Sequence, residues 1–375
     1  MPYWRLSGFY FFYFSSLGAL APYWGLYLKS LGFTAAAIGT MMAIIMATKI
    51  VSPNIWGWIA DHTGKRMAIV RLGGLLSAIA FAGVFVSQEY WWLIIVMMVF
   101  SFFWNATLPQ FEATTFSHLG EHTHRYSSVR LWGSIGFMVA VWIIGQQLEG
   151  SKISYLPMIL MGLFITIWVS SLIVPEEAAG HLHLHGEPLK IVLKRPEVVG
   201  LLIICFLMQL GHGPYYTFYS IYMQDHGYSL SFIGFLWALG VLAEVLIFMR
   251  MHKLVPRFGL KRLLVVSLLI ASARWVIIAL FPASMPLMVI AQIFHAASFG
   301  LYHAVAIQLI HQYFVGKNQG KGQALYSSVS FGAGGAIGSL YAGYTWEYLG
   351  TTTTFMIAAG VSLIAVYIAY KKIPA

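Results

Sequence analysis

The sequence predicts an all-α integral membrane protein made of twelve transmembrane helices in two pseudo-symmetric bundles of six. Three observations support this prediction: an apolar composition, apolar runs of membrane-spanning length, and an internal repeat. Hydrophobic residues make up 59% of the 375 residues and charged residues only 9%, and the mean hydropathy is +0.76. Soluble domains typically contain about 25% charged residues. The composition therefore indicates that lipid surrounds most of the chain.

The apolar runs have lengths close to the roughly 20 residues that a helix needs to cross the hydrocarbon core. They are continuous rather than alternating, which argues against a transmembrane β-barrel. We therefore expect twelve spanning helices, near residues 5–28, 36–60, 67–87, 91–117, 127–148, 155–174, 198–222, 230–251, 263–281, 286–313, 323–345 and 351–370.

The basic residues predict the orientation of these helices. With the N-terminus inside, 18 of the 22 Lys and Arg residues fall in or beside cytoplasmic segments, and only Lys29 and Lys152 lie outside. Lys and Arg are enriched in cytoplasmic loops, so we expect both termini in the cytoplasm and a multi-pass location in the cell inner membrane. The net charge of +10 is then explained by topology, and no nucleic-acid partner is expected.

An internal repeat relates the two halves. At an offset of 195, "YLKSLGFTAAAIG" (27–39) aligns with "YMQDHGYSLSFIG" (222–234), and near an offset of 200 "YSSVRLWGSIG" (126–136) aligns with "YSSVSFGAGGAIG" (326–338). Duplicated halves of this kind place a substrate site at their interface and alternate its access between the two sides of the membrane. The repeat predicts a transporter, which we expect to be a monomer.

The composition changes sharply between the halves, which predicts three segments. Residues 1–174 form an N-terminal six-helix bundle, 175–197 a cytoplasmic loop and 198–375 a C-terminal six-helix bundle. The loop contains the run "HLHLH", with His181, His183 and His185. Three alternating histidines without a fourth ligand are weak evidence for a metal site. We expect a solvated loop and no metal.

Ionisable residues inside spans are the first functional candidates, because charge is costly there and usually faces a cavity or a partner. Glu112 and Glu244 are the acids well inside spans, and Lys49 and Arg274 are the basic residues near mid-span. The offset of 195 also places Lys49 opposite Glu244. A carboxylate whose cation partner changes with conformation can load and release a proton.

We therefore expect Glu244 to carry the proton, with Arg274 or Lys49 as the modulating cation. His295 and His303 are second candidates, because eight residues place them on roughly one face of helix 10. The alternative for Glu244 is a static ion pair that fixes helix packing, and packing is equally the alternative for the two histidines.

The segment "GWIADHTGKR" (57–66) resembles the loop signature of the major facilitator superfamily. The resemblance implies a cytoplasmic gating motif and the fold of that superfamily. We expect Gly57 to allow close helix approach, Asp61 to face a helix N-terminus or a basic residue, and Gly64 to form the turn. The predicted gating residues are Gly57, Asp61, Gly64, Lys65 and Arg66.

A closer resemblance covers essentially the whole chain. The segments "VRLWGSIGF" (129–137), "YYTFYSIYMQDHGYSLSFIGFLWALGVLAEV" (215–245), "SARWVI" (272–277) and "QIFHAASF" (292–299) look like the 3-phenylpropionic acid transporter family, which is similar to lactose permease and its proton symporter relatives. The resemblance implies a proton-coupled importer.

Matched position by position, the resemblance to lactose permease assigns sugar-contacting roles to Glu112 and Arg130. It also pairs Glu244 with Arg274 and matches a helix 10 histidine to His295, whereas the carboxylate expected three residues later is replaced by Ser298. Glu112 and Arg130 alternatively form a gate latch. A third alternative is that Arg130 holds a carboxylate substrate, because its planar guanidinium suits bidentate capture.

Aromatic residues on helices 1 and 7, which face the cavity in this superfamily, are candidate contacts for an aromatic acid. We expect Tyr13, His212, Tyr215 and Tyr216 to contribute to substrate binding, whereas Tyr23, Trp24 and Tyr219 alternatively anchor the helices at the membrane interface. Asn105 is expected to hydrogen-bond either substrate or a neighbouring helix.

The sequence therefore predicts proton-coupled uptake of a small organic acid. The alternatives are sugar or nucleoside proton symport and drug:proton antiport. No HExxH, GxSxG or phosphate-binding-loop pattern is present, so neither an enzyme nor a cofactor is expected.

Overall fold

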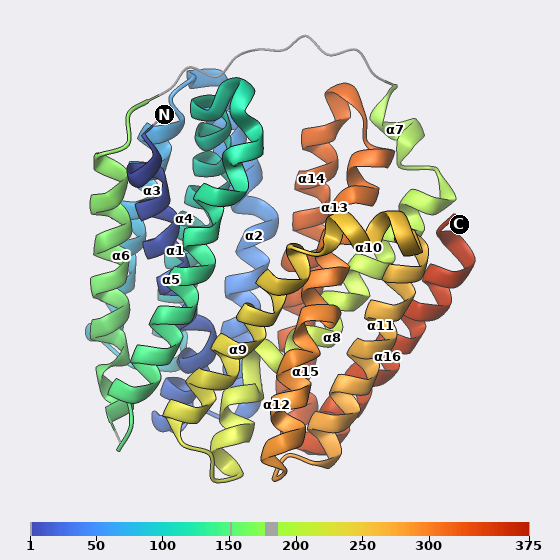
Figure 1. Cartoon of the computed structure of the whole chain (residues 1–375). Helices are drawn as coiled ribbons and strands as arrows, with labels where there is room; N and C mark the ends of the chain where they lie inside the picture. The colour runs from blue at the N-terminus through green and yellow to red at the C-terminus, as the bar shows by residue number, and fades with distance from the viewer. Residues whose placement is uncertain (1, 151, 177–186, 375) are drawn as a thin grey trace. The chain divides into compact units, whose positions relative to one another are not determined.

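The computed structural model describes residues 2–150, 152–176 and 187–374, and Figure 1 shows its helices in chain order. All regular secondary structure within these residues is helical. Ten helical segments among them are long and apolar enough to cross a membrane. The predicted all-α membrane fold is confirmed.

The long helices follow the predicted spans in order. Two of them continue through π-helical segments, η4 (Ala296–Leu301) and η6 (Ser328–Gly334). Short helices α7 (Leu189–Val192) and α10 (Met251–Phe258) lie between spans. The helices that make up the predicted spans are α1 (Tyr3–Ser30), α2 (Ala35–Thr63), α3 (Arg66–Phe81), α4 (Tyr90–Leu119), α5 (Tyr126–Gln147), α6 (Leu156–Leu172), α8 (Pro196–Asp225), α9 (Leu230–Phe248), α11 (Leu260–Leu280), α12 (Met285–Ile293) with α13 (Tyr302–Tyr313), α14 (Gln319–Ser327) with α15 (Gly335–Leu349), and α16 (Thr351–Lys372).

The chain forms two compact units. The first comprises Met1–Phe33, Ala47–Leu182 and Ser229–Ala238, and the second comprises Thr34–Met46, His183–Tyr228 and Leu239–Ala375. Helices α2 and α9 are each divided between the units. The predicted histidine run His181, His183 and His185 lies outside the described residues.

In the first unit, α1 packs against α5 and α6, and α3 packs against α4 and α6. The contact between α1 and α5 is close because Gly18 faces the backbone of Phe137: a Cβ at Gly18 would lie 2.7 Å from that carbonyl oxygen. Five residues after Gly18 on α1, the hydroxyl of Tyr23 donates a 2.6 Å hydrogen bond to the carbonyl of Val141 of α5. Small residues and a side-chain hydrogen bond therefore join these two helices.

In the second unit, α8 packs against α15 and α16, and α11 packs against α16. The two repeats differ in length at the π-helix that precedes α15. "YSSV" repeats at an offset of 200, whereas the glycines Gly136 and Gly338 that follow it are 202 residues apart. The π-helical segment η6 coincides with the stretch in which the second repeat is two residues longer.

We predict that Gly18→Ala destabilises the protein by about 1–3 kcal/mol, because the new Cβ forces α1 away from α5. Gly8→Ala on the same helix is the matched control, since no atom lies within 4 Å of a Cβ there. Thermal unfolding of the purified protein in detergent measures both. Equal midpoints for Gly18→Ala and Gly8→Ala would contradict the packing account.

Candidate functional site

The first candidate site is a buried polar cluster in the second unit, centred on Glu244. This residue lies in the second half of α9, and only 9% of it is exposed. Its Oε1 lies 2.7 Å from Nε2 of His295, which immediately precedes η4. The structure thus gives the intramembrane acid a hydrogen-bonded partner.

Arg274 of α11 contacts the opposite side of the same imidazole. Its Nη1 lies 2.9 Å from Nδ1 of His295, and its Nε donates a 2.8 Å hydrogen bond to the carbonyl of Ala291. Longer contacts reach the side chains of Ser298 and Gln292, at 3.3 and 3.4 Å. The guanidinium is fully buried. The groups that accept its hydrogen bonds in place of water are all neutral.

These contacts fix the tautomer of His295. A guanidinium has only donors, so Nδ1 of His295 must accept, and a neutral imidazole then carries its proton on Nε2. That Nε2–H donates to the carboxylate of Glu244. Within the described residues no salt bridge joins Arg274 directly to a carboxylate. The predicted pairing of Glu244 with Arg274 is therefore indirect, because the imidazole lies between them.

Two glycines bring α9 close to this cluster. A Cβ at Gly240 would lie 3.2 Å from Cδ2 of His295, and a Cβ at Gly300 would lie 3.2 Å from Cγ of Glu244. Gly300 belongs to the π-helical segment η4, whose residues Ala296–Leu301 are mostly small. Side chains at these positions would separate Glu244 from His295, so small residues are part of the site.

Aromatic rings surround the cation. The guanidinium carbon of Arg274 lies 4.2 Å from the ring centroid of Tyr215 and 4.7 Å from that of Trp275. Tyr215 also donates a 3.0 Å hydrogen bond to Oε1 of Gln292. Sequence reasoning did not single out Gln292, although an amide inside a span is the same kind of signal that singled out Asn105.

His212 lies beside this cluster with an unsatisfied nitrogen. Its Nδ1–H donates to the carbonyl of Met208 at 2.8 Å, and its ring is 4.9 Å from Trp275 and 5.7 Å from Tyr216. Neither Nε2 of His212 nor Nε2 of Gln292 has a hydrogen-bond partner among the described residues, and both are buried. The second unit therefore holds a buried acceptor and a buried donor that a ligand can satisfy.

His303 extends the cluster along α13. The ring of Phe299 stacks between the imidazoles of His295 and His303, with centroids 5.5 and 5.7 Å away. The expectation that the two histidines share one face is confirmed. Nδ1 of His303 lies 2.7 Å from the hydroxyl of Tyr326.

The second candidate site lies in the first unit and contains Glu112 and Arg130. Oε1 of Glu112 is 3.9 Å from Nε of Arg130 and accepts a 3.3 Å hydrogen bond from Tyr126. About a third of each side chain of the pair is exposed, 35% and 30% respectively. The guanidinium carbon of Arg130 lies 3.8 Å from the ring centroid of Phe14. A long ion pair and partial exposure leave this guanidinium accessible to an anion.

Two other predicted substrate contacts have protein neighbours in the first unit. Tyr13 stacks between Phe9 and Trp104, with ring centroids 6.2 and 5.1 Å away. The amide of Asn105 donates a 2.9 Å hydrogen bond to Thr48 of α2. For Asn105 the structure therefore contains the predicted contact with a neighbouring helix.

Lys49, the other predicted cation, lies on α2 in the first unit and is partly buried. Within the described residues its side chain makes no hydrogen bond or ion pair. The predicted role of Lys49 as the cation that modulates Glu244 stays a prediction.

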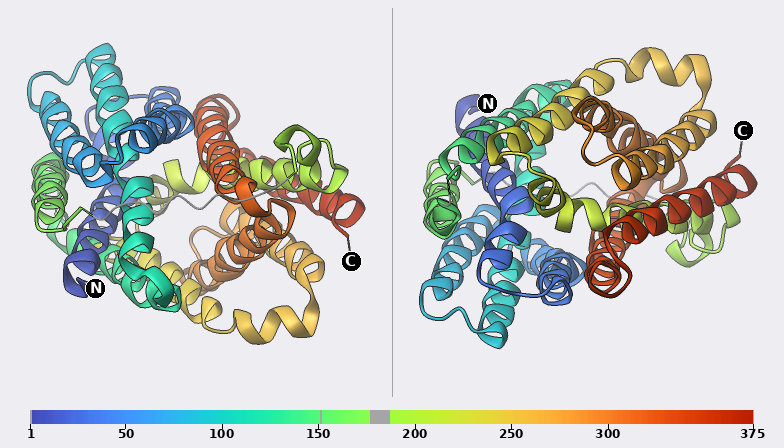
Figure 2. Two further views of the ribbon diagram at one scale, coloured as in Figure 1. Left: turned by 90° about the horizontal axis from the view of Figure 1, so that it is seen from above. Right: turned by 90° about the horizontal axis from the view of Figure 1, so that it is seen from below.

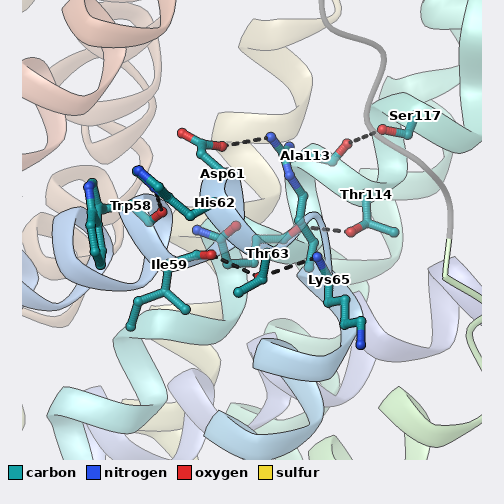
Figure 3. Close-up of polar contacts among 11 residues, drawn as sticks. Trp58, Ile59, Asp61, His62, Thr63, Lys65, Ala113, Thr114 and Ser117 are labelled. Atoms are coloured by element: carbon teal, nitrogen blue, oxygen red, sulfur yellow. Dashed lines mark hydrogen bonds and ion pairs between the residues drawn. The ribbon is translucent and has the colours of Figure 1, made fainter.

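The predicted gating motif comprises the C-terminal end of α2, the turn at residues 64–65 and the first residue of α3 (Figure 3). Gly64 has a φ of +69°, as expected of a glycine turn. Asp61 is exposed and lies 3.2 Å from Nη2 of Arg66 in the same turn. A Cβ at Gly57 would meet Nε2 of Gln110 at 3.6 Å, an ordinary contact, so close packing does not require a glycine there. No hydrogen bond or ion pair from the side chain of Lys65 is found among the described residues.

Comparison with known proteins decides the family. Residues 3–357 match the model of the MFS_1-like family. The chain belongs to this family of the major facilitator superfamily. The fold agrees, since the crystal structure of a point mutant of the nucleoside transporter NupG superimposes with a TM-score of 0.88 at 16% identity, covering 99% of this chain and all of that one.

Curated relatives match over almost their whole length. A probable 3-phenylpropionic acid transporter of Escherichia coli (strain K12) is 29% identical, covering 97% of this chain and 96% of the relative. A maltose permease of Geobacillus stearothermophilus is 26% identical, covering 97% and 93%. The protein is a multi-pass membrane transporter of the secondary type and not an enzyme.

Proposed function

We propose that the protein imports a small organic acid together with protons, by alternating access in the cell inner membrane, with both termini in the cytoplasm. An aromatic carboxylate is the leading substrate candidate. The observation that carries this proposal is the buried chain from Glu244 through His295 to Arg274. The similarity to a probable 3-phenylpropionic acid transporter supports the substrate class.

Glu244 has the properties needed to exchange a proton. As a carboxylate it accepts the Nε2–H of His295 and is stabilised by the nearby charge of Arg274. Protonation would remove that charge and weaken the hydrogen bond, which would loosen the second half of α9 from η4. Because α9 is one continuous helix that contributes to both units, this change would reach the first unit through a rigid element.

Arg130 is the proposed ligand for the substrate carboxylate. Its ion pair with Glu112 is long, and both side chains are partly exposed. A carboxylate held in the bidentate manner that suits a guanidinium would compete with Glu112 for it. In this proposal Tyr13, in the same unit, contributes aromatic surface for the rest of the substrate. Contacts of Tyr215 and Tyr216 with the substrate stay a prediction.

Symport of a sugar or nucleoside is the second candidate function. The unpaired Nε2 atoms of His212 and Gln292 favour it, because a buried acceptor and donor suit a hydroxylated substrate. The maltose permease and nucleoside permease relatives agree with this alternative. Counterflow of labelled acids, sugars and nucleosides in reconstituted vesicles separates these substrate classes, and the direction of proton flux separates symport from drug:proton antiport.

We predict that Glu244→Gln abolishes accumulation against a gradient while counterflow persists, because an amide cannot exchange the proton. In the wild-type protein each unit of pH gradient contributes about 1.4 kcal/mol to uptake. Vesicle uptake driven by an imposed pH gradient measures accumulation, and the exposed acid Glu89 provides the control Glu89→Gln. Full accumulation by Glu244→Gln would show that Glu244 only fixes helix packing.

We also predict that analogues lacking a carboxylate fail to compete for uptake, and that Arg130→Lys weakens competition by carboxylates about tenfold or more. The reason is the loss of charge-assisted bidentate hydrogen bonds. Competition with a labelled aromatic acid measures both effects, and Arg125→Lys, at an exposed arginine, is the control. Normal competition by carboxylate-free analogues would remove Arg130 from this role.

A further inference from the structure

A strongly basic segment connects α9 to α11. Residues 250–262 contain five Lys and Arg residues, one His and no acid. Arg250, Lys253, Arg257 and Arg262 are exposed, and Lys261 is partly exposed. No salt bridge joins any of the five to a carboxylate of the described residues. Within the described residues, these five positive charges therefore have no carboxylate partner.

The segment is held in place by its apolar side. Met251 of α10 is buried, and Leu254 and Val255 pack against the hydrophobic core of the second unit. The helix lies crosswise to the long helices, as the gold segment in Figure 2 shows. Lys253 and Arg257 are on its exposed side. The charges are thus displayed by a short helix that is itself anchored.

Lipid-facing stripes lead to these charges. On α11, Arg262, Val266 and Leu269 are spaced four and three residues apart and so share a face, and Val266 and Leu269 are 45% and 46% exposed. Large apolar side chains exposed on a transmembrane helix face lipid tails. An acyl chain lying along this stripe would have its headgroup close to Arg262.

A second exposed stripe, on α16, ends beside Lys261. Leu363, Tyr367 and Tyr370 have the same spacing, and the two tyrosines are 64% and 67% exposed. Helix α16 packs against α11, and Nζ of Lys261 lies 5.4 Å from the ring centroid of Tyr370. Tyrosine is typical of the headgroup level of a membrane. Lys261 and Tyr370 thus bring the ends of the two stripes together.

We propose that Arg257, Lys261, Arg262 and Tyr370 form a binding site for the headgroup of an anionic phospholipid. The basic side chains attract the phosphate and the stripes on α11 and α16 receive the acyl chains. Clusters of four or more Lys and Arg directly beside a transmembrane helix typically bind acidic lipids. The site depends on the membrane topology and is independent of proton coupling and of the transported substrate.

The test uses the full chain in a neutral detergent, titrated with phosphatidylglycerol or phosphatidylcholine, with bound lipid counted by native mass spectrometry. The variant Arg257→Gln, Lys261→Gln, Arg262→Gln should bind phosphatidylglycerol about tenfold or more weakly, with unchanged binding of phosphatidylcholine. The variant Lys190→Gln, Lys194→Gln, Lys321→Gln removes the same charge from exposed positions elsewhere in the second unit and should bind like the wild-type protein.

Two further measurements keep the test decisive. The variant Arg257→Lys, Arg262→Lys retains the charges and should retain binding, and thermal unfolding in detergent checks that every variant is folded. Equal loss of phosphatidylglycerol from the two glutamine triple variants would overturn the site, because it would indicate attraction to net charge alone. Displacement of the lipid by soluble glycerol phosphate at equal concentration would also overturn it, in favour of a site for free phosphate.

Discussion

The hydrogen bond between Glu244 and His295 is the interaction on which the rest of the second unit's polar core depends. A carboxylate in the middle of a membrane helix is costly without a partner. Here the imidazole supplies that partner and is itself held by Arg274. Removing the side chain of His295 or of Arg274 would leave the buried charge of Glu244 uncompensated, which is strongly destabilising. The three side chains therefore behave as one unit, in which the state of each depends on the others.

Backbone geometry makes this contact possible. Gly240 and Gly300 allow α9 to approach η4, and the π-helical turn precedes α13 without breaking the long helix. π-helical segments are frequent at functional sites because they change the direction of side chains locally. The second such segment, η6, coincides with the stretch in which the second repeat is two residues longer than the first.

Much of the fold could be predicted from the sequence because a membrane imposes simple constraints. Each span must satisfy its backbone internally, so the apolar runs identify the helices directly. The cost of intramembrane charge likewise singled out Glu244 and Arg274. The sequence did not reveal that His295 lies between them, because the rotation of each helix about its axis decides contact. Gln292 was missed because its role depends on the rotation of its helix, which brings the amide against Tyr215 and Arg274. The division of α2 and α9 between the two units has no local sequence signal.

In the first unit the candidate residues are held mainly by ring stacking and hydrogen bonds, and its ion pair is loose. The rings of Tyr13 and Trp104 stack against each other and Asn105 bonds to Thr48, whereas Arg130 and Glu112 are loosely paired and partly exposed. Under the proposed function, Arg130 of the first unit binds the substrate carboxylate and Glu244 of the second unit exchanges the proton. Helices α2 and α9 contribute residues to both units.

Infrared difference spectroscopy on substrate binding tests the central claim most directly, because it detects the protonation of a single buried carboxyl group. Binding of a transported acid should produce a protonated-carboxyl band in the wild-type protein and in Glu112→Gln, and no such band in Glu244→Gln. Persistence of the band in Glu244→Gln would show that another group carries the proton and would contradict the account.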